Sequence, residues 1–157
     1  MNDYLRLCLH AVRHALDFSG RASRAEFLAY LVLSQVPLVL ATWLAPGPFE
    51  AGVRLGAVLL TAIPLPALAI RRLHDFNTSG RWSLILIVLL ARFAVLEVLT
   101  MAAGWEARGM VEGPLAYFDW LLFIPGAALC LLLFAAPGST GENRFGRPPG
   151  DRETPEP

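Results

Sequence analysis

The most regular feature of this chain is a series of four apolar runs separated by shorter polar segments. A bilayer has a hydrocarbon core about 30 Å thick, and a helix rises about 1.5 Å per residue, so a spanning helix needs roughly 20 mostly apolar residues. The pattern predicts an all-α bundle of four transmembrane helices, at residues 27–48, 54–70, 82–103 and 114–136. Prolines inside these runs predict kinks, because neighbouring groups in a bundle can satisfy the carbonyls that proline frees.

The polar segments define the limits of the domain. Ser23 and Glu26 have the spacing of a capping box directly before the first apolar run, which predicts a helix start there. Residues 1–149 are expected to form a single membrane domain. Residues 150–157 combine Pro with charged residues, and we expect a disordered tail.

The segment before the first run has the periodicity of an amphipathic helix. Leu5, Leu9, Val12 and Leu16 fall on one helical face, and polar residues fall on the other. Such a helix is typical of the membrane interface, with its apolar face in the headgroup boundary. The alternative is that the apolar face packs on the protein's own helices.

The arginines indicate an orientation, because short cytoplasmic loops accumulate basic residues. All 13 basic residues are Arg, and they are unevenly placed. Four precede the first run, three lie in residues 71–81 and three follow residue 136, against Arg54 and Arg108 on the opposite side. The chain is therefore predicted to have both termini in the cytoplasm.

Composition supports this interpretation and excludes some functions. Apolar residues make up 55% of the chain, and the mean hydropathy is +0.52, more than a soluble domain usually carries. The net charge is zero, so no overall field would recruit nucleic acid, and we expect no nucleic-acid partner. Cys8 and Cys130 have no metal-ligand spacing. We expect no metal and no cofactor.

Three polar motifs are spaced along the chain. They are FSGRASRAEF at residues 18–27, RRLHD at 71–75 followed by Ser79-Gly80-x-Trp82, and GENRFG at 141–146. Together they resemble the bacterial inner-membrane proteins catalogued as domain of unknown function 805, over about residues 4–149. Leu28 and Arg81 stand where that family tends to have Trp. The resemblance implies a small multi-helix protein of the bacterial inner membrane and no catalytic residue.

By the predicted orientation, all three motifs lie on the cytoplasmic side and could form one polar surface. The candidate residues are Arg21, Arg24, Arg71, Arg72, His74, Asp75, Asn143 and Arg144. One interpretation is a structural collar in which charges pair and tie the loop and the tail to the helix ends. The other is a site for anionic lipid headgroups, which clustered Arg recognises.

A second candidate group lies within the apolar runs. Arg92, Glu97 and Asp119 are costly in hydrocarbon and mark either an internal ion-pair network or a transport pathway. Arg92 and Glu97 are five residues apart and do not share a helix face, so contact between Arg92 and Asp119 is at least as favoured. We expect a buried network that fixes helix packing, and the alternative is a polar pathway for an ion or small solute.

The sequence points to no reaction. His74 beside Asp75 is the nearest approach to an acid–base pair, but adjacent helical residues point apart and no nucleophile accompanies them, so we expect no enzyme. The favoured function is a lipid-interacting or partner-scaffolding membrane protein, in contact with the bilayer and its anionic headgroups. The alternative is a small transporter or channel subunit. Either could involve a homo-oligomer or another membrane protein.

Overall fold

The computed structural model describes residues 2–44 and 50–149, and every regular element in that part of the chain is helical. The elements are α1 (Asn2–Arg13), α2 (Arg24–Leu33), α3 (Gln35–Leu44), α4 (Glu50–Ala62), α5 (Pro64–Asp75), the 3₁₀ turn η1 (Gly80–Ser83) and α6 (Leu84–Ala135). The predicted all-α class is confirmed. The end of the first predicted span and the predicted disordered tail lie outside the described residues.

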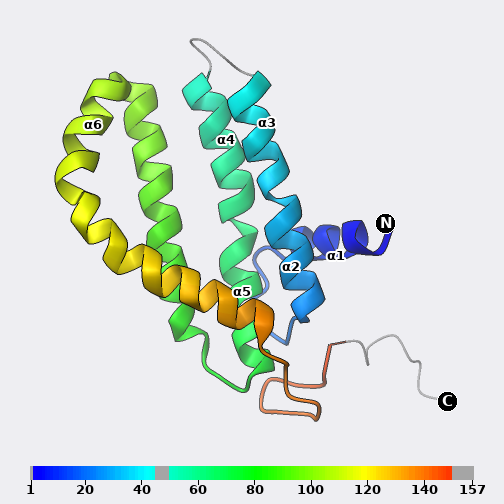
Figure 1. Ribbon diagram of the computed structural model, residues 1–157. Helices are drawn as coiled ribbons and strands as arrows, with labels where there is room; N and C mark the ends of the chain where they lie inside the picture. The colour runs from blue at the N-terminus through cyan, green and yellow to red at the C-terminus, as the bar shows by residue number, and fades with distance from the viewer. Residues whose placement is uncertain (1, 45–49, 150–157) are drawn as a thin grey trace.

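Helix α1 lies crosswise to the long helices and packs on α2 (Figure 1). Its inner face is small: Ala11 is fully buried, and Cys8 packs beside the same core. The apolar stripe points elsewhere. Its members are all at least 40% exposed: Leu5, Leu9, Val12 and Leu16. The stripe therefore does not pack on the protein's own helices.

Helix α2 starts where its capping residue predicts. Ser23 has an extended backbone, and its hydroxyl accepts a hydrogen bond from the backbone N–H of Glu26 at 3.0 Å. The return half of the capping box is not formed. The Glu26 carboxylate instead contacts His10 at 3.0 Å and Arg71 at 3.3 Å, so it joins α2 to α1 and α5.

Prolines divide two of the helical stretches. Helix α2 ends at Leu33, four residues before Pro37, whose ring cannot pack against that carbonyl in a continuous helix. Helix α5 begins at Pro64, which removes the donor for the Leu60 carbonyl. The Tyr30 hydroxyl donates to the Thr61 carbonyl at 2.6 Å and also lies 3.3 Å from that of Leu60. A side chain of α2 thus satisfies the carbonyls freed where α4 meets α5.

Helix α6 is a helical hairpin of two arms. Gly104 has φ 81°, in the left-handed region that favours glycine, and this residue separates the first arm, residues 84–103, from the second, residues 105–135. Figure 1 shows α6 rising, turning back and returning as a curved arm. The sequence analysis placed a loop at residues 104–113, and this is wrong, because only Gly104 departs from helical geometry. An ion pair between Arg108 and Glu112, one turn apart, supports the helix there.

The buried core contains only a small part of the chain's apolar side chains. Its buried residues come from α1, α2, α5 and α6 and include Phe27, Tyr30, Leu68, Leu73 and Leu133. Many larger apolar side chains face outward, and their exposed faces run along α3, α4 and both arms of α6. Within residues 2–44 and 50–149, two helical stretches are long and apolar enough to cross a membrane, Glu50–Asp75 and Gly80–Ala135. The first of these is longer at both ends than the predicted span of residues 54–70.

Candidate functional site

Asp75, the last residue of α5, joins two arginines from different parts of the chain. Arg21, between α1 and α2, donates from Nε and Nη2 to Oδ1 at 2.9 and 2.6 Å. Arg72, one turn earlier on α5, donates to Oδ2. All three side chains are 4% exposed or less. Charge-assisted hydrogen bonds of this kind are about twice as strong as neutral ones. We call Arg21, Arg72 and Asp75 the cap.

Arg72 also closes the carboxyl end of α6. Its Nε donates to the Leu133 carbonyl at 2.8 Å, and its Nη2 donates to that of Ala136 at 2.5 Å. The last carbonyls of a helix lack partners within the helix and carry partial negative charge. The buried guanidinium donates hydrogen bonds to these carbonyls and places a positive charge beside them, so α5 is fixed to the end of α6.

Arg21 organises the tail that follows α6. Nη1 donates to the carbonyls of Gly141 at 2.7 Å and Gly146 at 3.2 Å, and Nη2 donates to that of Ser139 at 2.5 Å. The cation thus sits among three backbone carbonyls and the carboxylate of Asp75. The third sequence motif is held against the first through its backbone carbonyls, which accept from the Arg21 side chain.

The tail approaches Asp75 closely at Gly138. A Cβ at this position would lie 1.8 Å from Oδ2 of Asp75, so the tail can pass only because the residue is glycine. The next residue, Ser139, donates its N–H to the Asp75 carbonyl at 2.9 Å and its hydroxyl to the same atom at 3.0 Å. The side-chain carboxylate and the backbone carbonyl of Asp75 therefore both accept hydrogen bonds.

Three more predicted residues lie around the cap. Asn143 donates from Nδ2 to the His74 carbonyl at 3.0 Å, and the His74 ring stacks on that of Phe145 at 3.8 Å. Arg144 is exposed and donates to the carbonyl of Asn77 at 3.0 Å. The structure brings these residues together with the cap, and His74 contacts backbone and an aromatic ring rather than Asp75.

Arg71 and Arg24 do not join the cap. Arg71 is buried and points toward Glu26, on the side of α5 that faces α1, and its Nε and Nη2 have no hydrogen-bond partner among the described residues. Arg24 is exposed and forms no ion pair with any residue in the described ranges. Arg71 faces away from Asp75 although Arg72 meets it, because neighbouring residues of a helix face different directions.

The charges within α6 form two groups and not one. Arg92 on the first arm pairs with Asp119 on the second at 2.5 Å, and the rings of Phe93 and Phe123 meet edge to face close by. Both charged side chains are mostly buried, at 15% and 21% exposed. This pair links the arms of the hairpin.

Glu97 has other partners, which corrects the expectation of one network. Its Oε1 accepts from Arg54 of α4 at 3.0 Å and from Arg108 of the second arm at 2.9 Å. Both cations also lie about 5 Å from the centre of the Trp105 ring, at 4.9 and 5.1 Å. Because Glu97 is five residues from Arg92, it faces α4 and the bend instead. We call Arg54, Glu97 and Arg108 the Glu97 cluster.

Sequence analysis counted Arg54 and Arg108 only as the two arginines of the non-cytoplasmic side, outside both candidate charge groups. A signal was nevertheless present, because each has a carboxylate four residues away, at Glu50 and Glu112, and both pairs form. Such spacing favours helix and predicts that the arginines lie on helices rather than in loops. It does not indicate that both reach Glu97.

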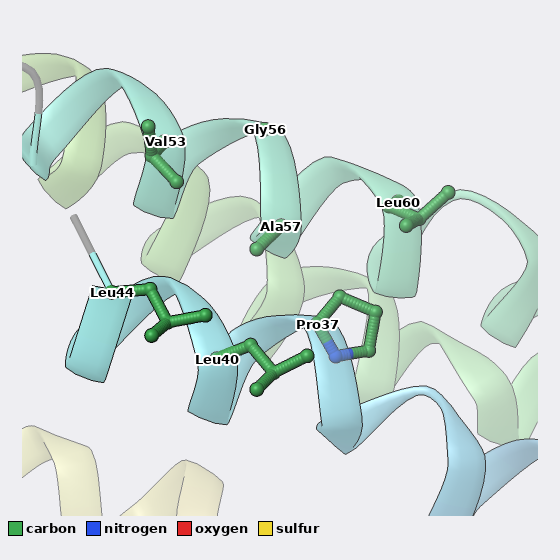
Figure 2. Close-up of a pocket in the computed structure, with 7 residues that line it drawn as sticks. All are labelled: Pro37, Leu40, Leu44, Val53, Gly56, Ala57 and Leu60. Carbon is green, nitrogen blue, oxygen red and sulfur yellow. The ribbon is translucent and has the colours of Figure 1, made fainter.

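Two hollows among the described residues are apolar. One, of about 370 Å³, lies between α3 and α4, and Figure 2 shows Leu40 and Pro37 of α3 facing Ala57 of α4 across it. The other, of about 620 Å³, lies between the end of α5, η1 and the second arm of α6. Neither is lined by the Glu97 cluster or by the Arg92–Asp119 pair.

The cap and the charge pairs all fall within the range that relatives share. The family described as Protein of unknown function (DUF805) matches residues 15–147. The chain belongs to this family. Inner membrane protein YhaI of Escherichia coli K12 is 26% identical over 143 residues, which cover 90% of this chain and 92% of that protein. Uncharacterized protein YiiR of the same organism is 26% identical over 138 residues, covering 83% and 84%. No solved structure matches.

Proposed function

We propose that this chain is an integral protein of the bacterial inner membrane that crosses it four times, with both termini in the cytoplasm. The crossings would be α2 with α3, α4 with α5, and each arm of α6. The outward-facing apolar side chains support this, since so extensive an apolar surface is unfavourable in water. The full-length similarity to a protein named as an inner membrane protein supports the location. The distribution of Arg supports the orientation.

In this arrangement α1 lies in the cytoplasmic interface. Its exposed Leu stripe would enter the headgroup boundary, while Ala11 and Cys8 keep the helix on the protein. Arg6 and Arg13 are exposed on the same helix and would meet the anionic leaflet. The helix therefore anchors the cytoplasmic end of the bundle at the membrane surface.

We further propose that the protein serves as a scaffold for lipids or a membrane partner rather than as a conduit. The observation that carries this is that charges within the apolar helices pair with one another. Arg92 meets Asp119, and Glu97 meets two arginines. A conduit needs polar groups that line a hollow. The hollow between α3 and α4 and the one beside η1 are apolar instead, and none of these charged residues lines either.

The cap then acts as a structural clasp. Arg21 and Arg72 are buried, and their nitrogens already donate to Asp75 and to backbone carbonyls. A guanidinium with its donors engaged has little capacity for a lipid phosphate. The clasp holds the tail, α5 and the end of α6 as one unit.

One observation favours the alternative of a transporter or channel subunit. Oε2 of Glu97 is buried and has no hydrogen-bond partner among the described residues. A carboxylate oxygen left open in this way could take a proton or a cation. The alternative therefore predicts that Glu97 controls a leak across the membrane.

A flux measurement in reconstituted vesicles separates the two functions. Vesicles with the purified protein, a pH dye inside and an imposed potential should acidify no faster than empty vesicles. Acidification that Glu97→Gln abolishes and Glu106→Gln leaves unchanged would overturn the scaffold. Glu106 is an exposed carboxylate near the same bend, which makes it the matched control.

The topology has its own test. Alkaline phosphatase, which is active only in the periplasm, should be silent when fused after Pro157 and active when inserted between Ala45 and Pro46. A strong signal from the carboxyl-terminal fusion would refute the proposed orientation.

A further inference from the structure

The apolar groove of about 620 Å³ at the end of α5 has the shape of a binding site for a chain-like apolar group. Its walls include Leu73, Phe76, Trp82, Ile85, Leu129 and Leu132. Its volume is within the range typical of small-molecule sites. The groove extends along α6 from Ala136 to Pro125, which is about 16 Å of helix. It therefore runs from the helix end into the depth of the apolar bundle.

A second hollow, called the polar hollow because Ser79 and Arg81 line it, shares Trp82 with this groove. It has a volume of about 320 Å³ and is lined by Ser79, Arg81 and Trp82. Trp82 lines both hollows and is 60% exposed, so its indole lies between them. An exposed Trp at the start of a membrane helix is typical of the headgroup level. Polar and apolar compartments thus follow one another in the order of a phospholipid's own parts.

Arg81 supplies an available positive charge at this junction. It is exposed, and its guanidinium is 3.4 Å from the Ser79 hydroxyl, with no ion pair to any carboxylate in the described part of the chain. This distinguishes it from Arg21 and Arg72, which are buried and engaged. The site therefore has a cation at its polar end and no cation along its apolar end.

We propose that the groove and the polar hollow form one site for an anionic phospholipid. An acyl chain would occupy the groove, and the headgroup phosphate would contact Arg81 and Ser79. The inference rests on the proposed function, because it needs η1 at the cytoplasmic surface of the membrane. It adds to that function the class of lipid and the residues that bind it.

Native mass spectrometry of the purified protein in mild detergent tests the site. Phosphatidylglycerol and phosphatidylcholine with identical chains are added at equal concentration. The protein should retain phosphatidylglycerol about 5-fold better, and Arg81→Gln should remove that preference, since one basic residue near an anionic surface is worth about that factor. Arg24→Gln, which removes another exposed arginine without an ion pair among the described residues, should leave the preference intact.

A second variant tests the groove. Ala128 is exposed on the groove wall, so Ala128→Phe fills the hollow without disturbing the core and should weaken retention of both lipids. Leu131→Phe adds an aromatic ring at an exposed position of the same arm, outside the groove. This variant should leave the retention of both lipids unchanged.

Three results would overturn the site. They are equal retention of the two lipids by the unmodified protein, unchanged retention in Ala128→Phe, or a change of oligomeric state in Ala128→Phe with lipid binding intact. The last would assign the groove to a second copy of the chain. The alkaline phosphatase fusion after Pro157 separates a failure of this lipid site from a failure of the proposed topology. A silent reporter with no lipid preference refutes this site alone, whereas an active reporter refutes the proposed topology.

Discussion

The two ends of the bundle hold their buried charges in different ways. In the cap, Arg21 and Arg72 share one carboxylate and direct their other nitrogens to backbone carbonyls. In the Glu97 cluster, at the bend of α6, the partners are carboxylates and the ring of Trp105. The cap side chains are almost fully buried, whereas Arg54 and Arg108 remain 19% and 10% exposed.

This difference has consequences for stability. Backbone carbonyls cannot move without the segments that carry them, so each bond of the cap fixes a piece of chain. Carboxylates on flexible side chains can adjust, and Arg54 and Arg108 each have a second acid, Glu50 and Glu112. Removing one charge should therefore cost more in the cap than in the Glu97 cluster.

The largest effect is expected from Asp75→Asn. The variant leaves two buried guanidiniums without a carboxylate, and breaking a buried pair typically costs about 3–5 kcal/mol. Thermal unfolding in detergent should show a large loss of stability. Glu142→Gln, an exposed carboxylate of the same tail, serves as the control. Equal stability of the two variants would mean that the cap does not hold the fold.

Gly138→Ala should have the next largest effect and tests the cap without changing any charge. The new methyl group would collide with Asp75 and displace the tail, and overpacking of this kind costs about 1–3 kcal/mol. Gly141→Ala is the matched control, because no atom lies within 4 Å of a Cβ there. Limited proteolysis of the tail should accelerate in the first variant only. Equal rates would place the tail away from Asp75 in solution.

Glu97→Gln should destabilise the protein less than Asp75→Asn, by about 1–2 kcal/mol. Glu50 and Glu112, which pair with Arg54 and Arg108, can partly compensate for the lost charge. The control is Glu50→Gln, whose pair with Arg54 is one helical turn long and worth about 0.3–0.5 kcal/mol. A loss for Glu97→Gln as large as that for Asp75→Asn would remove the contrast between the two ends.

The smallest effect is expected at Asp17, outside both charge groups. Hydrogen bonds from the Ser19 hydroxyl and N–H hold the pKa of this exposed carboxyl below its ordinary value of 3.8. A lowered pKa contributes stability above the ordinary value that is lost as the pH falls through the lowered one. Asp17→Asn should therefore cost under about 0.5 kcal/mol at pH 7 and nothing near pH 2. A deficit that persists near pH 2 would contradict this origin.

The sequence by itself determined that the apolar runs are helical and where α2 starts. Apolar runs of helical length and the capping serine at residue 23 are local features, and local features fix local conformation. The same holds for the amphipathic face of α1, whose period is visible in the residues. The family could also be identified from sequence, because its three motifs are short and contiguous.

Only the tertiary structure decided which charges meet. Sequence analysis left Arg92 free to contact Asp119 or Glu97, and it gave no reason to join Glu97 to Arg54 and Arg108. Those contacts depend on the relative rotation and height of α4 and both arms of α6. One glycine with a positive φ, Gly104, sets the bend where a loop was expected.

The contacts of the cap show most clearly what sequence analysis cannot predict. Arg72 binds backbone carbonyls at the end of α6, such as that of Leu133. Arg21 binds backbone carbonyls of the tail, such as that of Gly141. Every residue has a carbonyl, so no pattern of side chains reveals which ones a buried arginine will bind. Pairing between side chains leaves a trace in the sequence, whereas pairing with the backbone is decided by the fold alone.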